Sequence, residues 1–132
     1  MKYAKAFIAG LTLPSVLLPI MLSIAINAGK PEVLSVYFLH QLPLIWGAWN
    51  VLYFLLFKRL STNRNARLML TGAVLGFGVA VYGVFALDIP ALIGIEGLFR
   101  FLPLIIAPLI YALLWRFGVS PLNQLLGIQD DL

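Results

Sequence analysis

The stretch AFIAGLTLPSVLLPIMLSIAINA, residues 6–28, contains no charged side chain. It is long enough to cross a bilayer as a helix, which takes about 20 predominantly apolar residues. Lys2 and Lys5 precede it, so a cleaved signal peptide with a weak processing site at residues 23–25 is the alternative. The length of the apolar run and its two internal prolines favour a retained transmembrane helix.

Three further apolar segments follow at about residues 34–57, 68–87 and 98–117, and a short interfacial helix is expected at 121–126. The chain is 62% hydrophobic and only 11% charged, whereas a soluble domain has about 25% charged residues. A bilayer removes the need for a charged surface, because side chains that face lipid are apolar. The sequence therefore predicts an all-α fold: an integral membrane four-helix bundle of two antiparallel transmembrane hairpins, forming one domain over residues 1–132.

The basic residues are distributed unevenly between the two ends of these segments. One side carries Lys2, Lys5, Lys58, Arg59, Arg64, Arg67 and Arg116. Only Lys30 and Arg100 fall on the other side. Because cytoplasmic loops are enriched in Lys and Arg, this bias places both termini and the middle loop in the cytoplasm, as in a multi-pass protein of a cell inner membrane. Trp115 near the inner end and Tyr37 near the outer end fit the aromatic belts of the two interfaces.

The sequence also contains a weak internal repeat. Residues 40–45, HQLPLI, resemble residues 100–105, RFLPLI, at an offset of 60. The same offset brings the first apolar segment roughly onto the third. This pattern suggests two hairpins that arose by duplication, although apolar matches this short also arise by chance.

Polar side chains in apolar segments are costly in a bilayer, so their positions indicate either a binding site or polar contacts between helices. The candidate ligand-binding residues are His40, Arg100, Glu96, Asn27, Asp88, Asn50 and Tyr111. Most of the ionisable ones fall near the outer ends of the segments. We therefore hypothesise an outward-facing cavity that binds or transports a small polar or anionic solute, or binds a lipid headgroup.

Each of these residues also has a purely structural interpretation. Polar stripes on the first, second and fourth segments would converge in a bundle, but they could equally serve helix packing through hydrogen bonds. Asn50, between Trp49 and Tyr53, is by default such an interhelical residue. Glu96 and Arg100 have the i, i+4 spacing of an ion pair on a helix, which would occupy both groups.

Gly72 and Gly76 form a GxxxG motif in the third segment, which permits two helix backbones to approach closely. Another helix of this chain is the expected partner, and a homodimer seam is the alternative. A motif left unoccupied within the monomer would favour a subunit of a larger membrane complex. Internal use of the motif, together with a cavity that reaches Arg100, would favour a transporter.

Several chemistries are excluded by the residues that are missing. The chain has no cysteine, and its single histidine rules out bis-histidine haem ligation within one chain. There is no phosphate-binding loop, no HExxH and no Cys/His metal cluster, so we assign no catalytic residue, metal or cofactor. The basic residues flank apolar runs and form no nucleic-acid-binding patch. Three classes remain: a small transporter, channel or binding protein, an accessory or assembly subunit, and, least favoured, a lipid-modifying enzyme.

Overall fold

The computed structural model describes residues 1–56 and 62–128. The chain is 85% helical, and the described residues contain no strand, which confirms the all-α prediction. Three helical stretches are long and apolar enough to cross a membrane: Lys2–Asn27, Arg64–Ala86 and Gly97–Leu125. The fold is therefore compatible with a membrane protein.

Helix α1 (Lys2–Asn27) is continuous although Pro14 and Pro19 lie inside it. Its polar side chains bond within the helix. The Thr12 hydroxyl donates to the Ile8 carbonyl at 2.7 Å, and Ser15 and Ser23 donate in the same way to the carbonyls four residues before them. The polar stripe of the first segment is thus satisfied by its own backbone and does not converge on other helices.

The second apolar segment is not the single helix expected over 34–57. It consists of the 3₁₀ helix η1 (Pro31–Ser35), the single turn α2 (Tyr37–His40) and the longer helix α3 (Leu42–Leu55). Pro43 explains the second break, because a proline lacks the N–H that would bond to residue 39 and its ring clashes with that carbonyl. Phe57, Lys58 and Arg59 lie outside the described residues.

The third segment begins earlier than expected. Asn63 caps α4 (Arg64–Val81), since its side-chain oxygen accepts from the backbone N–H groups of Asn65 and Ala66. The helix then widens into the π-helical turn η3 (Tyr82–Ala86), and the single turn α5 (Ile89–Leu92) follows.

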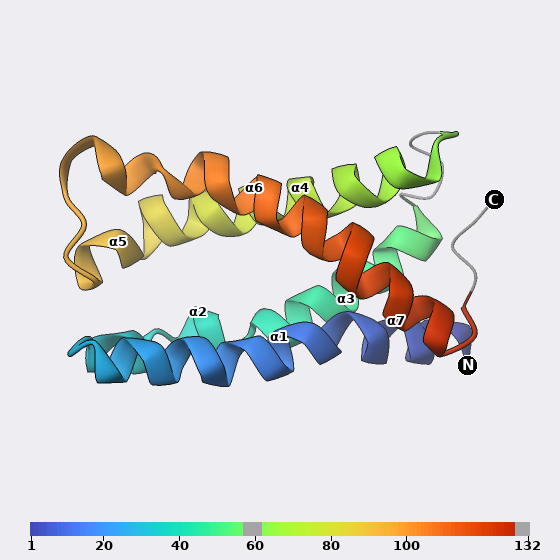
Figure 1. The fold of residues 1–132 in the computed structure, drawn as a ribbon, viewed down its shortest axis with the longest axis horizontal. Coiled ribbons are helices and arrows are strands. Elements are labelled where there is room, and N and C mark those ends of the chain that lie inside the picture. The colour runs from blue at the N-terminus through green and yellow to red at the C-terminus, as the bar shows by residue number, and fades with distance from the viewer. Residues whose placement is uncertain (57–61, 129–132) are drawn as a thin grey trace.

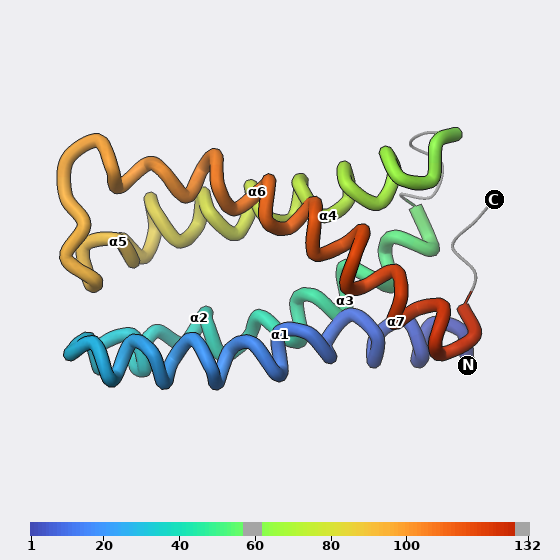
Figure 2. Tube along the Cα trace, in the orientation of Figure 1, coloured from blue at the N-terminus to red at the C-terminus, as the bar shows by residue number. Residues whose placement is uncertain are grey.

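The fourth segment runs further than its predicted end at 117. The 3₁₀ turn η4 (Gly97–Phe101) precedes α6 (Pro103–Leu114), which continues through the π-helical turn η5 (Trp115–Val119) into α7 (Ser120–Leu125). The short helix expected at 121–126 is therefore not a separate surface element. It is the last turn and a half of one long helical path (Figure 2).

The long helices pack as two pairs, α1 with α3 and α4 with α6 (Figure 1). We call the end where the N-terminus and α7 lie the terminal end, and the opposite end the distal end. At the terminal end, η5 and α7 cross from the second pair to contact α1. Toward the distal end the two pairs diverge, and α5 contacts η1 there.

Glycines set the close approach within each pair. A Cβ at Gly76 would lie 2.6 Å from the Ala107 carbonyl oxygen, and a Cβ at Gly72 would overlap the Tyr111 carbonyl. In the other pair, a Cβ at Gly10 would lie 2.9 Å from the Gly47 Cα. The GxxxG motif is thus used inside the monomer, between α4 and α6, as expected.

Candidate functional site

The buried polar residues gather at the terminal end and form what we call the terminal clamp: Asn50, Arg67, Thr71, Ser120 and Asn123. Each of these residues is at most 1% exposed. The Asn50 amide donates to the Asn123 side-chain oxygen and to the Ala6 carbonyl, both at 2.7 Å. The Asn123 amide donates back to Asn50 at 3.3 Å. These bonds join α3, α1 and α7, and therefore tie the two helix pairs together.

Two more hydrogen bonds lie at this end. The Trp49 indole N–H donates to the Thr71 carbonyl at 2.9 Å and joins α3 to α4, so it crosses between the pairs. The Arg64 guanidinium donates to the Ser120 hydroxyl at 2.5 Å and joins α4 to α7 within the second pair. The side chains of Asn50, Thr71, Ser120 and Asn123 each have a hydrogen bond within the protein, so we interpret the clamp as a structural joint.

Beside the clamp lies an aromatic core. The Trp46 ring meets the edge of Tyr111 at 4.9 Å between centroids and lies 5.2 Å from Trp115. Trp115 is fully buried, so its assignment to an interfacial belt was wrong. The reason is that the π-helical turn η5, which begins at Trp115, belongs to the part of the chain that crosses to the other pair.

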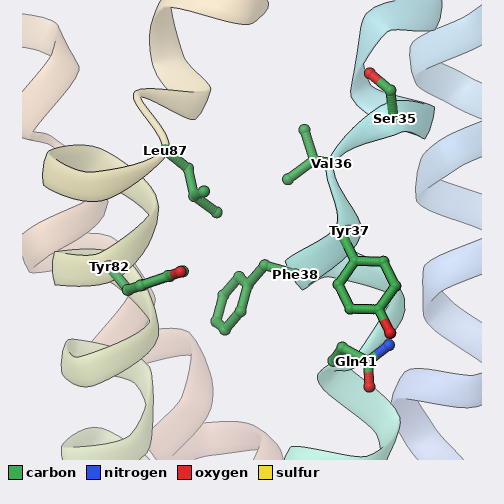
Figure 3. Close-up of a pocket in the computed structure, with 7 residues that line it drawn as sticks. All are labelled: Ser35, Val36, Tyr37, Phe38, Gln41, Tyr82 and Leu87. Atoms are coloured by element: carbon green, nitrogen blue, oxygen red, sulfur yellow. The ribbon is translucent and has the colours of Figure 1, made fainter.

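A cavity of about 380 Å³, which we call the distal cavity, lies between the two pairs near the distal end. Its wall consists of Ser35, Val36, Tyr37, Phe38, Gln41, Tyr82 and Leu87. The first five come from η1, α2 and the turns beside them, and the last two from η3 and its end, so each pair supplies one wall (Figure 3). This volume falls within the roughly 300–1,000 Å³ of small-molecule sites.

An aromatic pair spans the cavity. Phe38 and Tyr82 approach to 4.6 Å between ring centroids, and Figure 3 shows the two rings extending toward each other from opposite walls. Tyr82 is the first residue of the π-helical turn η3. Such turns shift the phase of the side chains around a helix and are frequent at functional sites. Tyr37 is 76% exposed and Tyr82 47%, so the cavity is open on one side.

The structure does not bring the seven predicted ligand-binding residues together. Asn50 belongs to the terminal clamp and Tyr111 to the aromatic core. The other five fall at or near the distal end, and none of the seven is part of the cavity wall. His40 and Asp88 come nearest in sequence, because each is next to a residue of the wall, Gln41 or Leu87.

The distal predicted residues are mostly exposed. Asn27 ends α1, and Asp88 occupies an exposed turn with a left-handed backbone (φ 50°) before α5. One ring nitrogen of His40, Nε2, lies 2.8 Å from the Leu34 carbonyl oxygen. These polar groups of the distal end are therefore exposed and do not line the cavity.

Glu96 and Arg100 do not form the expected ion pair within the described chain. Glu96 has an extended backbone (φ −126°, ψ 170°) and precedes η4, so the two residues do not share a helical turn. Arg100 is half-buried, with its guanidinium 5.1 Å from the centre of the Phe101 ring. Over residues 1–56 and 62–128, no group of three or more His, Cys, Asp or Glu side chains could hold a metal ion.

Sequence reasoning missed both Phe38 and Tyr82 as cavity residues, and Asn123 as the partner of Asn50. Aromatic residues near the ends of apolar segments are expected at membrane interfaces, so nothing in their type distinguishes a ligand-facing ring. Asn123 lies in a short segment that suggested a surface helix.

No protein-family model, curated protein sequence or solved structure shows significant similarity to this chain.

Proposed function

We propose that this chain is a membrane protein of four spanning segments, arranged as two hairpins, that binds a small molecule in the distal cavity. The observation that carries the proposal is the cavity itself, whose two walls come from different helix pairs and meet at the Phe38–Tyr82 contact. A site between two separable units can admit a ligand when they move apart, which is why ligand sites favour such interfaces.

The proposed orientation places the distal cavity on the side away from the cytoplasm. Lys2, Lys5 and Arg64 lie at the beginnings of helices that start at the terminal end, whereas Lys30 and Arg100 lie toward the distal end. The excess of basic residues at the terminal end supports a cytoplasmic location for it. Many large apolar side chains are exposed along α1, α4 and α6, as lipid-facing surfaces require.

Internal use of the GxxxG motif supports a binding protein over an accessory subunit. Gly72 and Gly76 already pack against α6, so this glycine face is not left open for a partner. A transporter was also expected to have a cavity that reaches Arg100. The distal cavity does not, because Arg100 is not part of its wall. The proposal is therefore ligand binding, with His40 and Asp88 at the rim of the cavity and no assigned transport step.

The test is native mass spectrometry of the protein extracted gently from its own membranes. We expect a small molecule to accompany the chain and to be lost in the variant Phe38→Ala, which opens one wall of the cavity. The matched control is Phe77→Ala, since Phe77 is 52% exposed on α4 and lies outside the cavity wall.

Two results would overturn this function. One is a stoichiometric protein partner with no retained small molecule, which would make the chain an accessory subunit. The other is a bound molecule that Phe38→Ala and Phe77→Ala retain equally, which would place the binding site elsewhere.

A further inference from the structure

The polar groups of the distal cavity are all uncharged. The wall combines the apolar side chains of Val36, Phe38 and Leu87 with hydroxyl and amide groups from Ser35, Tyr37, Gln41 and Tyr82. The Ser35 hydroxyl donates to the Glu32 carbonyl at 2.7 Å. The Tyr82 hydroxyl and the Gln41 amide have no partner in residues 1–56 and 62–128, and they are free to bind a ligand.

The nearest ionisable residues in sequence, His40 and Asp88, are not part of the cavity wall. Asp88 is exposed in a turn with a left-handed backbone. His40 uses one ring nitrogen on the Leu34 carbonyl, and the Arg100 guanidinium lies over Phe101. Lys30 extends to Gly94, where a Cβ would lie 3.4 Å from its ammonium nitrogen. Neither a cation nor a carboxylate therefore belongs to the described wall of the cavity.

This lining selects against a charged ligand group. Transferring an ion out of water into such a site is costly unless an opposite charge meets it, whereas a neutral polar group needs only a hydrogen bond. A phenol hydroxyl can donate to or accept from a ligand oxygen, and the glutamine amide offers both kinds of group. Beside them, Val36, Phe38 and Leu87 suit a hydrocarbon chain.

We propose, as a refinement that rests on the proposed function, that the distal cavity takes an uncharged amphiphile from the bilayer. One polar group of the ligand bonds to Tyr82 and another to Gln41, since Figure 3 shows these residues on opposite walls with Phe38 between them. The hydrocarbon chain packs on Phe38, Val36 and Leu87. The open side of the cavity, at the exposed rings of Tyr37 and Tyr82, lets such a molecule enter sideways. The ligand is thus a neutral lipid-like molecule and not the anionic solute that Arg100 suggests.

The test compares two lipids that differ only in a phosphate. The full chain is placed in phosphatidylcholine nanodiscs that contain dioleoylglycerol or dioleoyl phosphatidic acid, and binding of each is measured by native mass spectrometry. We expect dioleoylglycerol to bind in preference. Tyr82→Phe and Gln41→Leu should each weaken its binding roughly 2- to 10-fold, the loss of one hydrogen bond. Tyr3→Phe is the control, since Tyr3 is as exposed as Tyr82, at 47%.

The outcomes separate this refinement from the proposed function. Preference for phosphatidic acid, with loss of binding in Arg100→Gln, overturns the neutral-ligand assignment and leaves a binding protein. Failure of dioleoylglycerol to bind, or equal binding by Tyr82→Phe and the parent chain, also overturns the assignment. If in addition no small molecule accompanies the chain from its own membranes, the proposed function fails as well. Tyr82→Phe removes only one oxygen atom, so we expect the variant to fold like the parent chain. An unchanged melting temperature checks this.

Discussion

At the scale of single residues, the Asn50–Asn123 pair is a fully buried polar contact between the helix pairs. Both amides are fully buried, and two hydrogen bonds join them across 73 residues of sequence. Removing either side chain leaves the other as a buried group with unmet hydrogen bonds. Such a loss typically costs about 1–3 kcal/mol.

We therefore expect Asn50→Ala and Asn123→Ala each to lower the free energy of unfolding by about 1–3 kcal/mol. The double variant should cost clearly less than the sum of the two, because the second deletion removes a partner already lost. Thermal unfolding in detergent micelles measures all three. Asn65→Ala is the control, since its side chain is exposed. Additive losses would show that the two amides do not depend on each other.

Sequence reasoning anticipated half of this contact. An asparagine in the middle of an apolar segment, as at position 50, indicates an interhelical hydrogen bond because few other roles repay its desolvation. Asn123 gave no such signal, since it follows Ser120-Pro121 in a segment that matches the start of a separate surface helix. Its burial depends on η5 continuing the fourth helix, and no local pattern encodes that path.

At the scale of helices, the glycines of α4 distinguish its two faces. Gly76 faces α6, and a Cβ there would lie 2.6 Å from the Ala107 carbonyl. Gly78 is exposed, with no atom within 4 Å of the corresponding position. The two residues are close in one helix, so they share the same backbone conformation and differ only in what they contact.

The same substitution should therefore have opposite effects at the two positions. Gly76→Ala is expected to destabilise the fold by about 1–3 kcal/mol, the usual cost of overpacking. Gly78→Ala is expected to leave stability unchanged or to raise it by up to about 1 kcal/mol, because alanine favours a helix over glycine. Unfolding in mixed micelles compares them. Equal effects would mean that α4 and α6 are not in close contact through Gly76.

The sequence predicted that the elements are helices, but it did not predict where each helix breaks or continues. Apolar runs identify the long helices because only those residues can face lipid or pack between helices. Pro43 and Pro103, which are equivalent in the weak repeat, both fall within the first two residues of a long helix after a short turn. Gly47 and Ala107 share the same offset and both lie at a close approach. No sequence pattern marks the π-helical turns η3 and η5. A π-helical turn holds one residue more than an α-helical turn, and packing against the other helices decides where that residue is accommodated.

At the scale of the whole molecule, contact between the pairs is concentrated at the terminal end. The clamp and the aromatic core join the pairs there, whereas the distal end relies on α5 against η1 and on Phe38 against Tyr82. The sequence suggested a polar cavity at this end. It could not indicate that the lining would be uncharged, with three aromatic residues among seven, because that depends on the angle between the pairs.

The orientation of the chain in the membrane, with the terminal end in the cytoplasm, is a prediction. Cysteine labelling can test it. The chain contains no cysteine, so each introduced cysteine reports a single position. Glu32 is exposed in η1 at the distal end, whereas Asn65 and Leu125 are exposed in α4 and α7 at the terminal end. If the basic terminal end is cytoplasmic, the two groups of positions face different compartments.

We expect a membrane-impermeant maleimide to label Glu32→Cys in intact host cells, and to label Asn65→Cys and Leu125→Cys only after the membrane is permeabilised. Labelling all three in detergent controls for reactivity. The reverse pattern would place the distal cavity in the cytoplasm and would make the cytoplasmic leaflet the source of its ligand. If all three are labelled in intact cells, the helices do not separate two compartments and the four-span arrangement is wrong. Because the distal cavity lies at one end, the side on which Glu32 is labelled also decides which leaflet can supply an amphiphile to Phe38 and Tyr82.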